Sequence, residues 1–291
     1  MSAIAERRLR RPQADRLDSR RPGVGTVWRW ELRKLVSLKR TYLGLGAAVV
    51  FPLIFVIALA VQTGAPDDVL FGRAVRQSAF AIPLVLLLFG SIWFMPLVTA
   101  LVAGDIVATE DNNGTLKTIL TRSVGRGPIF AGKVLAAATY TVVAVLIFGL
   151  TGLIGGAIEV GFHPLVSLSG TVISTGEASR LEAAGFAVYL MPVLAVAAIG
   201  ILLSTVTRNS AAAVVGTLMF SLLLQLTQIV PGLKGVQPYL LPEQFNAWQG
   251  LLRQPIDTAP IVRAAWVCGL HAAIALTVAW LVFRRRDVAG G

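Results

Sequence analysis

Six long apolar runs without a single Asp, Glu, Lys or Arg constrain this chain more than any other feature. Each run is close to the roughly 20 residues that cross the hydrocarbon core of a bilayer as a helix. A transmembrane β-strand alternates apolar and polar residues over about ten positions, and these runs do not alternate. Backbone polar groups in lipid must be satisfied within the segment. We therefore predict an all-α polytopic protein with membrane-spanning helices at residues 41–61, 79–103, 134–158, 184–206, 210–230 and 264–283.

Composition excludes a soluble globule of this length. Hydrophobic residues make up 55% of the 291 residues and charged residues 14%, with a mean hydropathy of +0.73. Soluble domains carry about 25% charged residues, so too little polar surface is present to cover a water-exposed core. The single cysteine, Cys268, lies in an apolar run and excludes a disulfide within the chain.

The distribution of basic residues predicts the orientation. Of the 26 Lys and Arg residues, 12 precede the first span, within residues 1–40. With the N-terminus in the cytoplasm, 20 lie in cytoplasmic segments and 6 in outer ones. The positive-inside rule then predicts a plasma (inner) membrane protein with both termini cytoplasmic. The net charge of +11 is not gathered on a compact domain, so nucleic acid is not a predicted partner.

Two parts of the chain differ in composition. Residues 1–25 are rich in Arg and Pro without apolar periodicity, which predicts a disordered basic cytoplasmic tail. Residues 26–291 form the predicted six-span domain. The outer loop at 231–262 contains five prolines among apolar residues, which predicts short helices that dip into the outer leaflet.

An amphipathic helix is predicted over residues 26–40, before the first span. Its apolar residues recur at helical spacing, and its basic residues fall on the other side, toward anionic lipid headgroups. A plain cytoplasmic extension of the first span is the alternative. The apolar face comprises Trp28, Leu32, Leu35 and Val36, and the polar side comprises Arg29, Arg33, Lys34 and Ser37.

The most distinctive segment is the predicted inner loop at 104–133. Acidic residues come first, Asn112, Asn113 and Gly114 predict a turn, and 115–121 predicts a short amphipathic helix. Such a helix between two spans suits a docking element whose apolar side chains enter a groove of a partner. An interfacial helix that faces only lipid is the alternative.

This segment resembles the permease subunits of type-2 ATP-binding-cassette (ABC) exporters. Acidic residues are followed by GTLK, LTR and GK, and the last of these leads into a span. Many members of that family have Pro where this chain has Ser123, so the turn is expected to be less rigid. The layout of the rest of residues 26–286 is similar too. The matching residues are Asp105, Glu110, Gly114, Thr115, Leu116, Lys117, Leu120, Thr121, Arg122, Arg126, Gly132 and Lys133.

The resemblance implies a working arrangement. Two permease subunits, as a homodimer or with a paralogue, surround a path, and each docks on a separate ATPase subunit through the 110–122 helix. The ATPase, in two copies, binds ATP and Mg²⁺, and the chain itself is not an enzyme. The implied ATPase-coupling residues are Asp105, Glu110, Gly114, Thr115, Leu116, Lys117, Ile119, Leu120, Arg122, Arg126 and Arg208. The implied residues of the amphipathic (elbow) helix are Trp28, Glu31, Arg33 and Lys34.

One motif argues for ATP binding by the chain itself, and its details argue against it. Residues 127–133 match GxxxxGK, but the next residue is Val134 rather than Ser or Thr. The hydroxyl that would hold Mg²⁺ is missing, and Pro128 removes a backbone N–H. No cofactor and no metal site are predicted in this chain.

Polar residues within the spans leave several functions open. Gln225 and Gln228 stand three residues apart in the fifth span, where they line a substrate path or form interhelical hydrogen bonds. Spans without charge speak against a secondary transporter or channel, and two histidines and one cysteine offer little to an intramembrane enzyme. A non-transporting membrane anchor for an ATPase complex remains an alternative. The expected function is export of a hydrophobic or amphipathic compound.

Overall fold

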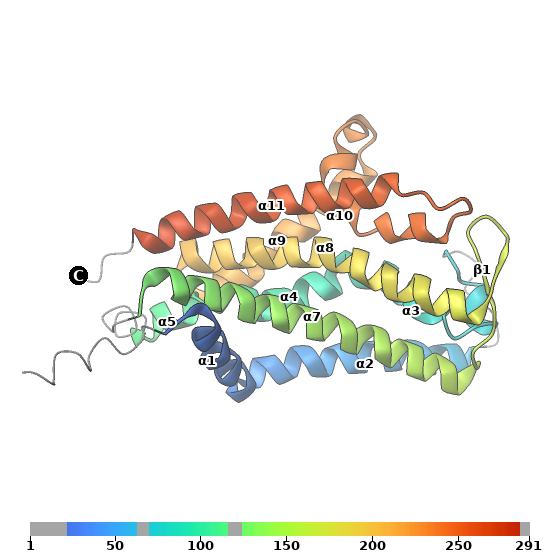
Figure 1. Ribbon diagram of the computed structural model, residues 1–291, viewed down its shortest axis with the longest axis horizontal. Helices are drawn as coiled ribbons and strands as arrows, with labels where there is room; N and C mark the ends of the chain where they lie inside the picture. Colours follow the sequence, from blue (N-terminus) through green and yellow to red (C-terminus); the bar gives the residue numbers. More distant parts are fainter. Residues whose placement is uncertain (1–21, 63–69, 116–123, 286–291) are drawn as a thin grey trace, which may run out of the picture.

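The computed structural model describes residues 22–62, 70–115 and 124–285, and long helices packed lengthwise make up most of them (Figure 1). Six helices in this part of the chain are long and apolar enough to cross a membrane. They coincide with the six predicted spans and confirm an all-α, multi-pass membrane protein. The spans are α2 (Lys39–Val61), α3 to α4 (Ala81–Ala103), α7 (Arg126–Glu159), α8 (Thr175–Thr207), α9 (Ser210–Leu226) with the short η3 (Thr227–Ile229), and α11 (Ala259–Arg284).

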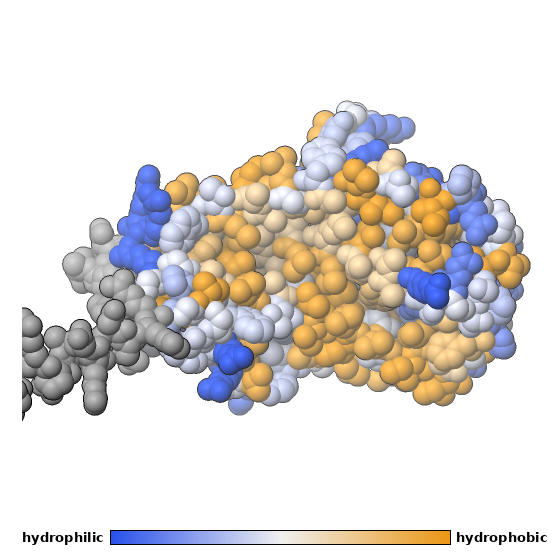
Figure 2. Space-filling model, viewed as in Figure 1, coloured by the Kyte–Doolittle hydropathy of each residue, from blue (hydrophilic) through white to orange (hydrophobic). Residues whose placement is uncertain are grey.

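On the face shown in Figure 2, apolar residues predominate through the middle of the bundle and hydrophilic residues gather toward its two ends. Helices α3 to α4 and α8 are mostly buried by their neighbours, whereas less than a third of the apolar stretch of α2, of α9 and of α11 is buried. Soluble monomeric proteins rarely expose an apolar surface of this extent to water. Lipid or another apolar subunit must cover it.

The helix of the second span is interrupted near its middle. A π-helical turn, η2 (Gly90–Phe94), separates α3 (Ala81–Phe89) from α4 (Met95–Ala103). Pro96 has no N–H to donate to the preceding turn, and an adjacent π turn accommodates that lost bond. The interruption exposes the carbonyl of Ser91 to a side chain from another helix.

Small residues allow α7 to approach its neighbours closely. A Cβ atom at Gly152 would lie 2.5 Å from the Leu86 side chain, and one at Gly156 would lie 2.8 Å from Ile82. The GxxxG spacing of these two glycines therefore forms the contact with α3.

Helix α8 begins earlier than the predicted span, and this corrects one sequence argument. Ser174 accepts a hydrogen bond from the Glu177 backbone N–H (3.4 Å) and caps a helix that starts at Thr175 rather than at residue 184. Serine followed by glutamate three residues later is a capping-box pattern. The earlier start places Glu182, which is buried, inside the helix. The long helices are therefore not free of buried charge.

The end of the bundle away from α1 carries a small hairpin and a helical loop. Strands β1 (Leu165–Val166) and β2 (Val172–Ile173) pair antiparallel, with Leu165 opposite Ile173. The predicted short helices of the 231–262 loop are confirmed, and the buried Trp248 anchors them against the bundle. Short helices between the spans include η1 (Ala74–Arg76), η4 (Pro231–Leu233), η5 (Gln237–Tyr239), α10 (Leu241–Gln244) and η6 (Ala247–Leu252).

The amphipathic helix is present as α1 (Val24–Ser37). Leu35 is buried and Trp28 and Leu32 pack against the core, as predicted, and only Val36 of the predicted apolar face does not. It crosses the bundle axis beside the start of α7 (Figure 1). The buried residues are Val27, Glu31 and Leu35, whereas Val36 is 61% exposed. The prediction placed Lys34 toward lipid headgroups, and this was wrong because carboxylates inside the chain bind its ammonium. The predicted tail lies outside the described residues, apart from residues 22–25.

Candidate functional site

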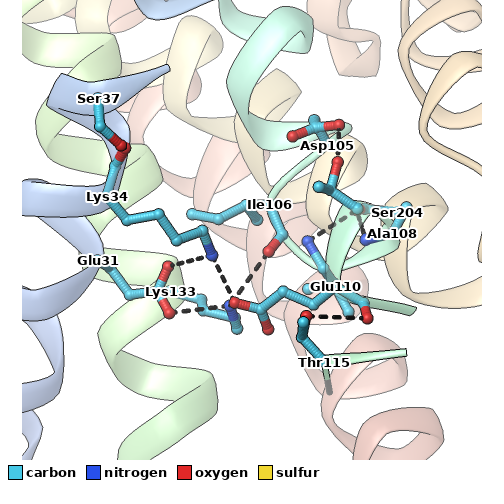
Figure 3. A network of polar contacts seen from close by, with 12 residues as sticks. Glu31, Lys34, Ser37, Asp105, Ile106, Ala108, Glu110, Thr115, Lys133 and Ser204 are labelled. Carbon is cyan, nitrogen blue, oxygen red and sulfur yellow. Dashed lines mark hydrogen bonds and ion pairs between the residues drawn. The ribbon is translucent and has the colours of Figure 1, made fainter. Parts of the chain in front are cut away.

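A buried ionic cluster joins three helices at the end of the bundle where α1 lies (Figure 3). Glu31 and Lys34 come from α1, Glu110 comes from the short helix α5 (Ala108–Asn112), and Lys133 comes from the first turns of α7. Their side chains point toward one another, although they are up to 102 positions apart in the sequence. Four charges that cancel in pairs are the arrangement that a protein interior tolerates.

Lys133 is the centre of this cluster and is fully buried. Its Nζ lies 2.9 Å from Oε1 of Glu31 and 2.6 Å from Oε1 of Glu110. It also donates a hydrogen bond to the carbonyl of Ile106 (3.2 Å). All three donors of the ammonium are thereby directed to acceptors on α1, on α5 and on the turn between α4 and α5. One side chain thus fixes three segments to α7.

Lys34 forms the second bridge between α1 and α5. Its Nζ lies 3.0 Å from Oε2 of Glu31 and also pairs with Oε1 of Glu110. Burial alone would lower the pKa of Lys34, but the carboxylates of Glu110 and Glu31 outweigh it and raise that pKa. Burial would raise the pKa of Glu110, but the ammonium groups of Lys133 and Lys34 outweigh it and lower that pKa. The cluster therefore favours the charged forms of Lys34 and Glu110.

Small residues bring α1 close enough for these pairs. A Cβ atom at Gly132 would lie 2.6 Å from the side chain of Val27 and 3.1 Å from the backbone N of Trp28. Trp28 donates its indole N–H to the hydroxyl of Thr139 on α7 (3.1 Å). Gly132 therefore allows α1 to approach α7 closely, and the adjacent Lys133 supplies the charge that pairs with Glu31 of α1.

A second set of polar contacts lies next to the cluster and is centred on Asp105. The carboxylate of Asp105 pairs with Arg40 of α2 and accepts hydrogen bonds from the hydroxyls of Thr109 and Ser210. Ser204 of α8 accepts the backbone N–H groups of Val107 (3.1 Å) and Ala108 (2.9 Å) at the start of α5. Because five-residue α5 has few bonds of its own, these contacts hold it against α2, α8 and α9.

A recess of about 230 Å³ opens beside the cluster, between α1 and the start of α7. Glu31, Lys34 and Glu110 form its polar part, and Oε2 of Glu110 is buried without a hydrogen-bond partner among the described residues. The remaining lining residues are apolar: Val27, Trp30, Val124 and Ile129.

The other predicted coupling residues divide into three groups. Gly114, at φ +66°, and Thr115 end α5 in the predicted turn, and both are exposed. Arg208 is exposed in the α8–α9 turn at φ +56°, while Arg126 donates to the carbonyl of Arg284 at the end of α11. Arg33 of α1 is also exposed. The remaining predicted residues lie outside the described part of the chain: Leu116, Lys117, Ile119, Leu120 and Arg122.

The two glutamines proposed for a substrate path lie elsewhere. Gln225 donates to the Ser91 carbonyl in the π turn (3.3 Å), so it forms an interhelical hydrogen bond. The cavity beside it is about 10 Å³, which holds no solute. The amide nitrogen of Gln228 is buried without a hydrogen-bond partner among the described residues.

Several residues of the site escaped the sequence-based selection. Lys133 matches the permease family at the sequence GK (Gly132 and Lys133), but the sequence did not predict it as a coupling residue. In the structure residues 127–133 are part of helix α7. Arg40, Ser204 and Ser210 carry no local signal, because their role depends on which helices meet. Among the described residues, no group of three or more His, Cys, Asp or Glu side chains is placed to hold a metal ion.

Comparison with known proteins gives one result. A family described as a protein of unknown function (DUF2705) matches residues 50–289. No curated protein matches the sequence.

Proposed function

The chain belongs to the DUF2705 family, and we propose that it is the membrane-spanning permease subunit of an ABC exporter. It forms part of a translocation path and docks on a separate ATPase through residues 110–122. The observation that carries this proposal is the ionic cluster at the root of that segment. It supports the proposal because it connects the segment to the spans.

The cluster provides a mechanical route from the docking segment to the membrane. A partner that pushes on the segment after α5 displaces Glu110, whose carboxylate is bound to Lys133 of α7 and Lys34 of α1. Separating buried ion pairs costs several kcal/mol, so the three helices move together. The short α5 thereby transmits a displacement to the long span α7.

The rim of the recess offers further contacts for a partner. Apolar side chains of Trp30, Val124 and Ile129 stand beside the charges of the cluster. An apolar side chain of the ATPase fits such a recess, and exposed charges such as Arg208 and Arg33 set the register. ATP and Mg²⁺ bind to the ATPase in this arrangement, and lipid and a second permease subunit cover the exposed faces of α2, α9 and α11.

Glu182 favours one alternative function. A buried carboxyl in a membrane-spanning helix is a feature of proton-coupled transporters and channels. Those proteins need a chain of titratable groups, and the cavity around Glu182 contains no second one. An anchor that holds an ATPase at the membrane without transport would use the same ionic cluster.

The proposal is tested by affinity purification of the full chain from its native membrane, followed by mass spectrometry. We expect a stoichiometric nucleotide-binding subunit with the wild type. Leu116→Asp places a charge in the docking segment, outside the described residues, and we expect it to lose that subunit while it still inserts. Val236→Asp also replaces an apolar residue with Asp, at an exposed site in the loop between α9 and α11, and is the control. Equal recovery of an ATPase with both variants, or none with the wild type, contradicts the proposal.

The orientation and the plasma-membrane location are part of the same proposal. They rest on the basic residues that surround the ionic end. Cys268 is the chain's single cysteine and is buried, so an introduced cysteine at an exposed site is labelled selectively. In intact cells, a membrane-impermeant maleimide should label Val236→Cys and leave Thr115→Cys unlabelled. The reverse labelling pattern would show that the orientation is opposite to the one proposed.

A further inference from the structure

A cavity of about 220 Å³ lies between α7 and α8, in the half of the bundle away from the ionic cluster. Gly149 is 16 residues beyond Lys133 on α7, which separates the two sites by about 24 Å along the helix axis. Two exposed leucines, Leu146 and Leu150, form the rim of the cavity. The lining residues are Phe80, Leu146, Gly149, Leu150, Leu153, Ser179, Glu182, Ala183 and Phe186.

Glu182 is the one ionisable side chain in this lining. It is 5% exposed, and its Oε2 is buried without a hydrogen-bond partner among the described residues. An ionised carboxylate without a partner in apolar surroundings is costly. Such a carboxyl avoids the cost by keeping its proton or by pairing with a cation. A cation that enters the cavity would offset the cost of ionisation, so the site favours a positively charged ligand.

The rest of the cavity selects an apolar body around that charge. Its walls are aliphatic except for Ser179 and two aromatic rings, Phe80 and Phe186. The face of an aromatic ring attracts an ammonium group, most strongly where water is excluded. The volume is below the roughly 300 Å³ at which pockets for drug-sized ligands begin. The site therefore fits a small ligand or one end of a longer one.

The rim indicates the direction from which a ligand arrives. Leu146 and Leu150 are 46% and 54% exposed, and they belong to the apolar surface that lipid or another subunit covers. An amphiphilic molecule dissolved in the bilayer reaches this opening without crossing water. A hydrated inorganic cation would have to lose its water shell among apolar side chains.

We propose that this cavity binds an organic ammonium group on a small apolar body, with Glu182 as its counter-ion. Two sources carry that chemistry: a free amphiphilic amine and the amine headgroup of a membrane lipid. The proposal does not depend on an ATPase, because the cavity belongs to one chain.

The test uses the purified full chain in nanodiscs of phosphatidylglycerol, a lipid without an amine. We titrate benzyltrimethylammonium, with benzyl alcohol as the uncharged comparison, by isothermal titration calorimetry. The wild type should bind the cation in preference to the alcohol, and Glu182→Gln should weaken cation binding by about tenfold or more. Glu177→Gln removes an acid from the exposed start of the same helix and should bind as the wild type does. Equal affinity of Glu182→Gln and wild type overturns the proposal.

A second variant fills the cavity without changing its charge. Ala183 is an exposed lining residue, so Ala183→Phe should block binding while the protein remains folded. Cation binding at wild-type affinity by Ala183→Phe would place the ligand elsewhere and overturn the proposal.

Lipid retention distinguishes the two sources. Native mass spectrometry of protein taken from membranes rich in phosphatidylethanolamine should show that lipid retained by the wild type and lost in Glu182→Gln, if the lipid headgroup is the source. Equal retention by both forms, with the cation still bound only by the wild type, assigns the cavity to a free amine.

Discussion

Glu110 and Glu182 are two buried glutamates at opposite ends of the same bundle, 4% and 5% exposed. Glu110 pairs with Lys34 and Lys133, whereas Oε2 of Glu182 has no partner among the described residues. The cost of burying the first carboxylate is offset within the chain, and the cost of burying the second is not. Equal burial therefore has opposite meanings: the first glutamate stabilises the fold, and the second is available to a ligand.

Removal of the central ammonium should have the largest effect on stability. Lys133→Met leaves Glu31 without its Lys133 contact and Glu110 with Lys34 alone, and it should lower the free energy of unfolding by about 3–5 kcal/mol. Urea denaturation in detergent, followed by circular dichroism, measures it. Lys39→Met removes an exposed cation and should change that free energy by about 0.5 kcal/mol or less. A loss in Lys133→Met as small as that of the control would show that the cluster does not hold the helices together.

Removal of the paired glutamate should cost less. In Glu110→Gln, Lys133 keeps Glu31 and the Ile106 carbonyl, so we expect a loss of about 2 kcal/mol in the same assay. A gain in stability would make Glu110 equivalent to Glu182 and remove the contrast between the two ends.

The same pair predicts a pH dependence. The lowered pKa of Glu110 contributes stability that is present above the ordinary glutamate pKa of about 4.3 and is lost as the pH falls through the lowered value. The raised pKa of Lys34 contributes stability that is present below about 10.4 and is lost as the pH rises through the raised value. Wild-type stability should therefore decline at both extremes, and Glu110→Gln should reduce the acid decline. If Glu110→Gln loses as much stability at low pH as the wild type does, other carboxyl groups cause that loss.

Glu182→Gln should act in the opposite direction to Glu110→Gln. It removes a group that costs free energy to bury and breaks no ion pair with another described residue, so the free energy of unfolding should stay the same or rise by up to about 1 kcal/mol. The assay is denaturation without an added cation. A loss of 2 kcal/mol would reveal a partner inside the fold.

The smallest effect is expected at Gln225. Gln225→Leu removes one hydrogen bond to the Ser91 carbonyl, which is worth about 0.6 kcal/mol within a membrane protein. If Gln225 lines the translocation path, export should change while assembly does not. Export at the wild-type rate would leave only the interhelical role.

The spans were predictable because apolar length is a local property, and each predicted span lies within or overlaps one of the six long helices, although α7 and α8 begin earlier than predicted. The start of α8 was missed because the uninterrupted apolar run begins only after Glu182. The sequence does contain a helix-capping pattern, Ser174 followed by Glu177. The apolar face of α1 was predicted correctly at Trp28, Leu32 and Leu35. The burial of Glu31 was missed because the periodicity contains no information about Lys133. Ion pairs between positions 102 apart follow from helix packing, which no local pattern encodes.

The most direct test of docking is a cross-link at the proposed contact. Thr115 and Val236 are both exposed; Thr115 follows α5, and Val236 lies in the loop between α9 and α11. A photo-activated benzophenone amino acid is placed at either position in native membranes, and its adducts are identified by mass spectrometry. The account predicts a nucleotide-binding ATPase attached at position 115 and not at 236. No ATPase at position 115, or the same ATPase at both positions, would contradict it.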